Sequence, residues 1–209
     1  MLKIYGNKMS GATKKVLYTA ELLQLQYEFK ELDFKTELKT PEFLKIHPAG
    51  KVPAIDDNGF ILFESGAICK YLCNKNNNQS NQNNSSVYPQ DLKQRAIVDQ
   101  WIDFCSFHIA VGISKVVYNT VFAKRMERAP DENALQQGFD EIARFMPIID
   151  AQLQKHSFIA GDHLTVADLT LLASIDYAVM AEIDLSNYPA VMQWKNKITA
   201  EHFWKKWNE

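Results

Sequence analysis

Apolar residues in the first third of the chain repeat at two different spacings, and each spacing predicts a different element. A short apolar run at 2–6 is typical of a strand, and apolar residues from Ala12 to Leu23 recur at the spacing of a helix face. A second extended run follows at 27–34. Because a helical crossover joins the two extended runs, they should lie side by side as parallel strands.

A β-hairpin is predicted next by the turn residues Asn58-Gly59, which readily take positive φ values. The flanking segments 52–55 and 60–63 should therefore pair as antiparallel strands. Ser65 then precedes an apolar run at helical spacing, and its hydroxyl can cap that helix. The order strand, helix, strand, hairpin and helix predicts an α/β domain with a thioredoxin-like fold.

The chain beyond residue 91 shows only helical periodicity. Asp91 can cap a first helix, and a long second helix is predicted over 132–153. Thr165 and Asp168 have the spacing of a capping box at the start of the apolar run 169–175, with Asp in place of the usual Glu. An all-α helical domain should therefore follow the α/β domain.

A change in composition separates the two predicted domains. From Asn74 to Ser86 the chain is rich in Asn, Gln and Ser and contains no apolar residue. Such a segment cannot bury enough surface to offset the entropy of ordering it. We therefore expect a thioredoxin-like domain over 1–76, an Asn/Gln/Ser-rich linker over 77–90 and an all-helical domain over 91–209.

Composition and charge narrow the class of protein. With 209 residues, of which 46% are hydrophobic, the chain can form two cores. The net charge of −2 and the lack of a basic stripe argue against nucleic acid as a partner. The start of the chain has no signal-peptide pattern and no apolar run approaches membrane-spanning length, so we expect a cytoplasmic protein that does not enter a membrane.

The three cysteines are expected to be free thiols, because their number is odd and the predicted compartment is reducing. Cys69 and Cys73 share a helix face and should be half-buried packing residues, and Cys105 lies in the helical domain. None of them belongs to a cluster with metal-ligand spacing, so no metal site is predicted.

The segment around Pro53 is the strongest candidate for a binding site. Proline lacks a backbone N–H, so Pro53 suits an edge or a bend of the sheet, and the bond from Val52 to Pro53 is the best candidate for a cis peptide. The polar backbone groups of Val52 would then be free for a ligand. The helix start at Ser65 attracts a carboxylate, and Glu64 can hold an ammonium group. The carboxylate and the amine of an amino acid would both find partners here, next to backbone groups that could pair with a peptide.

The Gly-Lys-Val-Pro stretch at 50–53, followed by the Glu-Ser pair, resembles the glutathione-binding half of the cytosolic glutathione transferases. The resemblance implies that Val52, before a cis Pro53, pairs with the cysteinyl backbone of glutathione. It also implies that Glu64 and Ser65 hold the γ-glutamyl end of glutathione.

Further residues take their expected roles from this resemblance, which covers nearly the whole chain. Lys51 and Lys39 would contact the glycyl carboxylate of glutathione, although Lys39 fits equally well as a solvated surface lysine. His47 is expected to be a loop residue without a catalytic role. Thr165 and Asp168 match a capping box that starts the core helix of the helical domain in this family, so we assign them to folding.

Ser10 is the predicted catalytic residue. A hydroxyl at the positive end of a helix can donate a hydrogen bond to the sulfur of a bound thiol and favour the thiolate. The stretch Tyr-Gly-x-x-Met-Ser at 5–10 resembles the serine-type members of the family, nearest to the plant phi class and its bacterial relatives. Three alternatives stay open: Ser10 is only a helix cap, or Tyr5 or Thr13 supplies the activating hydroxyl.

The resemblance implies that the second substrate binds in a cleft between the domains, lined partly by the first helix of the helical domain. Candidate walls are Met9, Phe107, His108, Val111 and Phe122, and each of them also fits a plain core position. We interpret His108 as a hydrogen-bonded core histidine rather than a base, because it lies on an apolar helix face.

The implied function is that of a glutathione transferase in detoxification. Glutathione would be the co-substrate, a small hydrophobic electrophile the second substrate, and the same thiolate could reduce a peroxide. A homodimer is expected. Two other interpretations stay open: a non-catalytic docking module, like the transferase-like domain of translation elongation factor 1B gamma, and a carrier that binds its ligands without turnover.

Overall fold

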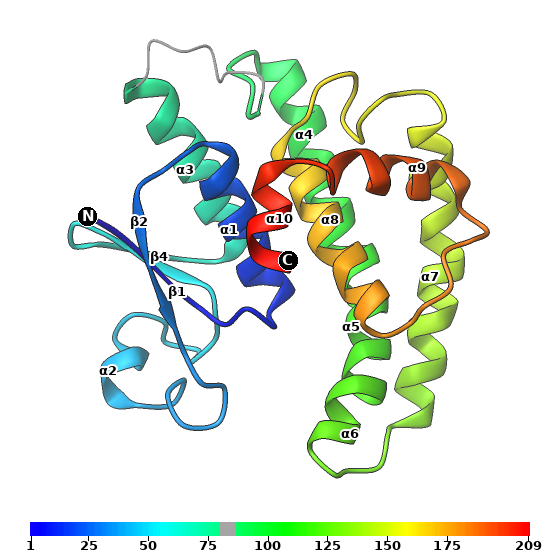
Figure 1. Ribbon diagram of the computed structural model, residues 1–209, viewed down its shortest axis with the longest axis horizontal. Helices are drawn as coiled ribbons and strands as arrows, with labels where there is room; N and C mark the ends of the chain where they lie inside the picture. The colour runs from blue at the N-terminus through cyan, green and yellow to red at the C-terminus, as the bar shows by residue number, and fades with distance from the viewer. Residues whose placement is uncertain (80–86) are drawn as a thin grey trace. The chain divides into compact units, whose positions relative to one another are not determined.

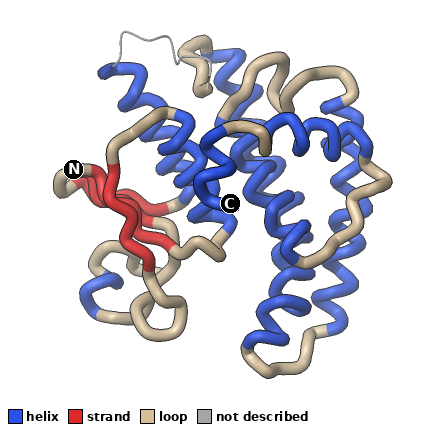
Figure 2. Tube along the Cα trace, in the orientation of Figure 1, coloured by secondary structure: helices blue, strands red, loops and turns tan. Residues whose placement is uncertain are grey.

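The computed structural model describes residues 1–79 and 87–209, which form two compact units (Figure 1). The first unit comprises Met1–Tyr88 and Glu201–Glu209, and the second comprises Pro89–Ala200. The first unit holds a sheet with helices, and the second is helical (Figure 2). Both predicted fold classes are therefore present, in the predicted order.

A four-stranded sheet forms the centre of the first unit. Its strands are β1 (Leu2–Gly6), β2 (Tyr27–Glu31), β3 (Ala54–Asp57) and β4 (Phe60–Phe63), in the spatial order β2-β1-β3-β4. β1 pairs with β2 in parallel, as predicted, and β3 pairs with both of its neighbours in antiparallel orientation. This mixed topology is the predicted thioredoxin-like arrangement.

The turn chemistry of the hairpin is confirmed, but the strand bounds differ from the prediction. Asn58 and Gly59 have φ values of 55° and 93°, which suit the tight two-residue turn between β3 and β4. β3 begins two residues later than predicted, and β2 ends at Glu31 rather than at residue 34. Because β3 lies between β1 and β4, Pro53 is not on an edge strand; it occupies the bend just before β3.

Helices cover both faces of the sheet. α1 (Gly11–Leu22) contacts α3 (Ser65–Gln79), and α3 contacts β3 and β4. On the other face, the ring of Tyr5 in β1 lies 6.3 Å from that of Phe43 in the short helix α2 (Pro41–Leu44). This side assignment follows from the strand alternation, because Tyr5 is flanked by inward residues of β1.

Helix α10 (His202–Asn208) belongs to the first unit, whereas the predicted helical domain ran to residue 209. α10 packs on α1, and the buried ring of Phe203 lies 5.9 Å from the fully buried ring of Tyr18. Contacts distant in sequence, rather than the local helical pattern, place these last residues with the sheet.

The predicted linker 77–90 is described only in part. Residues 77–79 continue helix α3, and residues 80–86 lie outside the described residues. Val87 and Tyr88, which end the first unit, are buried.

The second unit is built from helices of very different length. A continuous helical stretch runs through α4 (Leu92–Phe104), the π-helical segment η2 (Cys105–Ile109), α5 (Ala110–Val117), the π-helical segment η3 (Tyr118–Phe122) and α6 (Ala123–Arg125). It is followed by α7 (Glu132–Leu153), α8 (Val166–Met180) and α9 (Pro189–Ile198). The predicted bounds 132–153 are those of α7, and Asp91 caps α4 as expected by accepting from two backbone N–H groups.

Helix α8 is the core of the second unit, and the predicted capping box starts it. The backbone N–H of Thr165 donates to the carboxylate of Asp168 at 2.9 Å. The same fully buried carboxylate also accepts from the Ile159 backbone N–H and from the indole N–H of Trp194. Asp168 therefore ties the start of α8 to a neighbouring loop and to α9, which supports a role in folding.

Two expectations are not met: that no apolar run approaches membrane-spanning length, and that Cys69 and Cys73 are half-buried. The helical stretch Leu92–Arg125 is long and apolar enough to cross a membrane by length and composition, although the core helix of a soluble protein passes the same test. Cys69 and Cys73 are fully buried rather than half-buried, and burial raises the pKa of both thiols. All three cysteines are free thiols, as predicted.

Candidate functional site

Several chain segments meet at one end of the sheet in the first unit. β1 finishes there at Gly6, which pairs with the last residue of the parallel strand β2. Ala54, the first residue of β3, pairs on one side with Tyr5 and on the other with Phe63, the last residue of β4. The segments beyond these strand ends carry the predicted glutathione-binding residues, which are Ser10, Lys39, Lys51, Val52, Pro53, Glu64 and Ser65.

Ser10 is the N-cap residue of α1. Its side-chain oxygen accepts a hydrogen bond from the backbone N–H of Thr13 at 3.3 Å, and its backbone N–H donates to the Asn7 carbonyl at 2.8 Å. A hydroxyl that accepts the capping bond still has its own proton to donate. The capping and catalytic interpretations of Ser10 are therefore compatible.

The two alternative residues, Thr13 and Tyr5, both make packing or hydrogen-bond contacts within the first unit. Thr13 is fully buried and its hydroxyl oxygen accepts from the Asn7 backbone N–H at 3.3 Å. Thr13 also lies against Gly6, where an added Cβ would come within 2.3 Å of the threonine methyl carbon. Tyr5 packs on Phe43, as expected for an aromatic residue in a strand. Thr13 therefore has a structural role in the loop before α1.

Asn7 holds the loop that leads to Ser10, and the sequence prediction did not include it. Its side-chain amide donates to the carbonyl of Leu32 at 2.8 Å and accepts from the backbone N–H of Met9 at 2.9 Å. The loop after β1 is thus joined to the residue that follows β2. An asparagine in a loop after a strand is the only local signal that could have indicated this role.

The segment before β3 has the predicted geometry. The peptide bond from Val52 to Pro53 is cis, as expected. Within the described residues, no hydrogen bond involves the backbone N–H or C=O of Val52, since the pairing of β3 begins at Ala54. The polar backbone groups of Val52 are therefore available to a peptide ligand.

Lys39 lies beside this segment. Its ammonium donates to the Ala49 carbonyl at 3.2 Å, and Gly50, with a φ of 59°, approaches the same side chain so closely that a Cβ there would lie 2.9 Å from the lysine nitrogen. Lys39 and Lys51 are both exposed. Lys39 thus places a positive charge beside Gly50, and Lys51 is the residue before Val52.

The start of α3 differs from the prediction in one detail. The carbonyl of Glu64 accepts the first helical hydrogen bond, from the Ile68 backbone N–H at 2.9 Å, so Glu64 occupies the capping position. Ser65 is the first residue of the helix rather than its cap. Glu64 has a φ of 70°, which is uncommon for a residue with a side chain. The Glu64 side chain is exposed, and Ser65 lies at the positive end of the helix.

His47 is more buried than a loop residue is expected to be. Only 3% of it is exposed, and its ring lies 4.6 Å from the ring of Phe63. Burial lowers the pKa of His47, which favours the neutral imidazole. A neutral, packed ring agrees with the expected lack of a catalytic role and supports the position of the residues before Glu64.

The candidate walls for the second substrate are divided between the two units. Met9 lies in the loop before α1, and the other four belong to the second unit. Phe107 and His108 lie in η2 and Phe122 in η3, and Val111 lies in α5. Segments of π-helix often occur at functional sites.

His108 is not a core histidine, which corrects the prediction. Its side chain is exposed, and its ring lies 5.0 Å from that of Phe104 and 4.6 Å from that of Phe145. Phe107 and Val111 are 67% and 40% exposed, so they are also surface residues rather than core. These side chains form an apolar and aromatic helix face.

Comparisons with known proteins show which family the chain belongs to. The model of the glutathione S-transferase N-terminal domain matches residues 1–74, and the model of the C-terminal domain matches residues 112–202. A probable glutathione S-transferase, GSTF2, from Oryza sativa subsp. japonica is 31% identical over 95% of this chain and 92% of its own length. The chain belongs to the glutathione S-transferase family.

Solved structures of transferases are similar over the full chain. Glutathione transferase F2 from Populus trichocarpa has a TM-score of 0.91 at 31% identity, covering 99% of this chain and 97% of its own. A glutathione S-transferase-I with the ligand lactoylglutathione bound has a TM-score of 0.87 at 26% identity, covering 99% and 97%. These relatives confirm the predicted family and the predicted similarity to its phi-like members.

The transferase therefore has the predicted class of activity, with glutathione as its co-substrate. In the described part of the chain, no group of three or more His, Cys, Asp or Glu side chains could hold a metal ion.

Proposed function

We propose that this transferase activates glutathione through Ser10 and joins its sulfur to an electrophilic carbon of a small hydrophobic compound. The thiol proton leaves to solvent, and the sulfur lone pair forms the new C–S bond. The leaving group departs with its bonding electrons, or the acceptor carbon chain takes up a proton. The position of the Ser10 hydroxyl at the start of α1 is the observation that carries the proposal.

The energy required is within reach of this geometry. A free thiol has a pKa of about 8.5, and lowering it by about two units needs about 2.7 kcal/mol of preferential stabilisation of the thiolate. One charge-assisted hydrogen bond contributes about 1.5–3 kcal/mol, and a helix N-terminus adds about 0.3–1 kcal/mol. Ser10 and the first turn of α1 together supply enough.

The remaining parts of glutathione match the chemistry around the sheet end. Glu64 can accept from the γ-glutamyl ammonium, and Ser65 with the first N–H groups of α3 can bind the γ-glutamyl carboxylate. The free backbone of Val52, before Pro53, can pair with the cysteinyl residue. Lys39 and Lys51, both exposed, can approach the glycyl carboxylate. The lactoylglutathione bound to a relative of the same fold supports a glutathione-type ligand.

The test is an ultraviolet titration of the thiolate band of bound glutathione, with wild-type protein and with Ser10→Ala. We expect the pKa of the bound thiol to lie at least about one unit below that of free glutathione, and to return towards the free value in the variant. The proposal is wrong if the lowered pKa survives the substitution.

Ser65→Ala is the matched control, because it removes a hydroxyl from the same site but at the γ-glutamyl end. It should weaken glutathione binding and leave the pKa of the bound thiol lowered. If Ser65→Ala abolishes the pKa shift while Ser10→Ala does not, the two roles are reversed. Far-ultraviolet circular dichroism of both variants separates these effects from loss of the α1 cap.

We propose that Phe107, His108, Val111 and Phe122, on η2, α5 and η3 of the second unit, form the surface that binds the electrophile. Phe107, His108 and Val111 are exposed, and Phe122 is partly exposed. A hydrophobic second substrate suits this lining. If the thiolate instead reduces a peroxide, Ser10 would stabilise the sulfur in the same way.

A homodimer in the cytoplasm is part of the same proposal. Strand β4 is an edge strand whose Phe60, Ile61 and Phe63 are 49%, 37% and 39% exposed. An exposed apolar edge strand favours association, because its unpaired and hydrophobic surface is otherwise a liability. Sedimentation equilibrium should show a dimer for the wild type and a shift to monomer for Phe60→Glu.

A further inference from the structure

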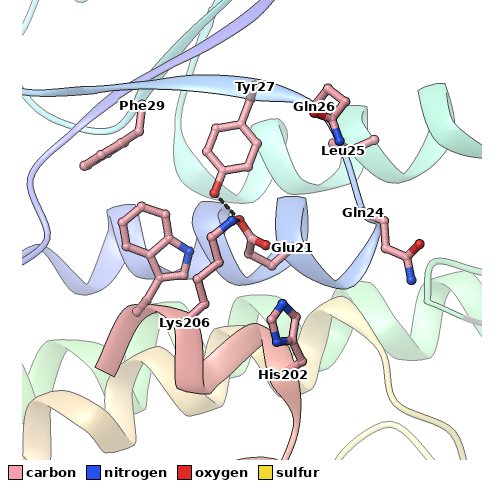
Figure 3. A pocket seen from close by; sticks show the side chains of 9 residues that line it. Glu21, Gln24, Leu25, Gln26, Tyr27, Phe29, His202 and Lys206 are labelled. Atoms are coloured by element: carbon pink, nitrogen blue, oxygen red, sulfur yellow. Dashed lines mark hydrogen bonds and ion pairs between the residues drawn. The ribbon is translucent and has the colours of Figure 1, made fainter. Parts of the chain in front are cut away.

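A cavity in the first unit lies away from the proposed glutathione site. It has a volume of about 580 Å³ and lies between the end of α1, the start of β2 and α10 (Figure 3). Tyr27, which lines it, pairs with Leu2 at the start of β1, whereas the proposed site lies beyond Gly6 at the end of β1. The cavity is therefore at the opposite end of the strand.

A carboxylate lies at the centre of this cavity. The side chain of Glu21 is only 9% exposed, and one of its oxygens accepts from both the Tyr27 hydroxyl and the Lys206 ammonium, the latter at 2.7 Å. Figure 3 shows these groups converging from α1, β2 and α10. Burial and the Glu21 charge raise the pKa of Tyr27 well above its ordinary value, so Tyr27 stays a donor. A mostly buried carboxylate requires a positive partner.

Aromatic rings surround the carboxylate. The ring of Phe29 lies 5.2 Å from that of Trp207 in an edge-on arrangement, and both residues line the cavity with Tyr27. The Lys206 nitrogen lies 5.8 Å from the centroid of the Tyr27 ring. Faces of aromatic rings attract cations, and Lys206 shows where an ammonium group is held.

We propose that this cavity binds an organic ammonium ion that carries an aromatic group, with Glu21 as the counter-ion and Tyr27, Phe29 and Trp207 as the walls. Lys206 then acts as an internal competitor. The Lys206 side chain is 48% exposed, so a ligand can displace it from Glu21 towards water. The volume lies within the usual range of about 300–1,000 Å³ for small-molecule sites.

Charge selects the class of ligand. An anionic ligand of the same shape would face the Glu21 carboxylate, and the Lys206 ammonium is already paired with that carboxylate. An ammonium ion instead replaces the Lys206 charge on Glu21 and frees that lysine to return to water. The cavity therefore discriminates between two ligands that differ only in the sign of their charge.

The experiment is calorimetric titration of the whole chain with 2-phenylethylamine and with 3-phenylpropanoate, which share a ring but carry opposite charges. We expect binding of the amine only. Lys206→Met should strengthen amine binding by about threefold to fivefold, because it removes the competitor. Glu21→Gln should weaken it by at least about tenfold.

Lys205→Met is the matched control, since Lys205 is an exposed lysine on the same helix that does not line the cavity. It should leave amine binding unchanged within about twofold. Glutathione binding by each variant shows that the fold is intact; if Glu21→Gln fails to fold, the opposite sign expected for Lys206→Met still decides.

Three results would overturn the proposal. The first is no amine binding by either the wild type or Lys206→Met, and the second is equal binding of the amine and the acid. The third is weaker binding after Lys206→Met. The ¹⁵N-labelled indole resonance of Trp207 must also shift on titration, because binding elsewhere would leave it in place.

Discussion

At the scale of single residues, the loop before Ser10 depends on a contact that admits only glycine. A Cβ at Gly6 would lie 2.3 Å from the Thr13 methyl carbon and 2.9 Å from its hydroxyl oxygen, and Thr13 is fully buried. Thr13 in turn holds both Asn7 and the Ser10 oxygen by hydrogen bonds. The position of the proposed catalytic hydroxyl is thus fixed by three neighbouring residues.

We predict that Gly6→Ala lowers the free energy of unfolding by about 1–3 kcal/mol, the usual cost of overpacking a buried site. Thr13→Ser removes the clashing methyl group and keeps the hydroxyl. The double variant should therefore be more stable than the sum of the two single effects, as urea denaturation in a double-mutant cycle would show. Purely additive effects would mean that the two side chains do not compete for the same space.

At the scale of elements, local signals predicted the boundaries that depend on local chemistry. Asn58-Gly59 specified the hairpin turn, and the periodicity of 132–153 specified α7. The capping residue of α3 could not be predicted, because Glu64 takes a positive φ that its residue type does not indicate. The local pattern therefore places the capping position at Ser65, one residue too late.

The long helix of the second unit shows the same limit. Its apolar pattern indicates a helix, but nothing in it marks the π-helical segments η2 and η3, where one residue is accommodated in a wider turn. His108 lies in η2, and it is exposed rather than buried, with its ring near those of Phe104 and Phe145. The sequence identified Phe107, His108 and Val111 as candidates, but it did not predict that their side chains are exposed.

Helix α8 carries a prediction about pH, because Asp168 is fully buried at its start. Burial raises the pKa of Asp168 from 3.8 to about 6, despite hydrogen bonds from Ile159, Thr165 and Trp194 that favour the carboxylate. The native state therefore binds a proton more tightly than the unfolded state does. This contribution to stability is fully present below pH 3.8 and is lost as the pH rises through about 6.

We predict that the stability of the wild type, relative to Asp168→Asn, falls by about 2 kcal/mol between pH 4 and pH 7. The amide does not titrate, so the variant lacks this part of the pH dependence. Urea denaturation of both proteins across this range measures the difference, and other titrating groups cancel. A constant difference across the range would show that the pKa of Asp168 is not raised.

At the scale of the whole molecule, the order of segments along the chain does not match the two compact units. The chain leaves the first unit after Tyr88, builds the helical unit over Pro89–Ala200 and returns with α10 to the helices that cover the sheet. The change in composition predicted the boundary between two domains, and the order of elements and the helical periodicity predicted their folds. The return of α10 depends on contacts of Phe203 with Tyr18, which are distant in sequence and leave no local signal.

We predict that Phe203→Ala weakens the first unit, although Phe203 follows the helical unit in the sequence. Phe203 is 3% exposed, and truncation of a buried phenylalanine costs about 3–5 kcal/mol. Native-state hydrogen exchange should show faster exchange of amides in α1, which α10 covers. Ile198→Ala, which truncates a buried residue of α9, is the control and should instead speed exchange in α7 and α9. Faster exchange confined to α7 and α9 in the Phe203 variant would show that α10 stabilises the helical unit, and the cavity between α1, β2 and α10 would then lack its stable wall.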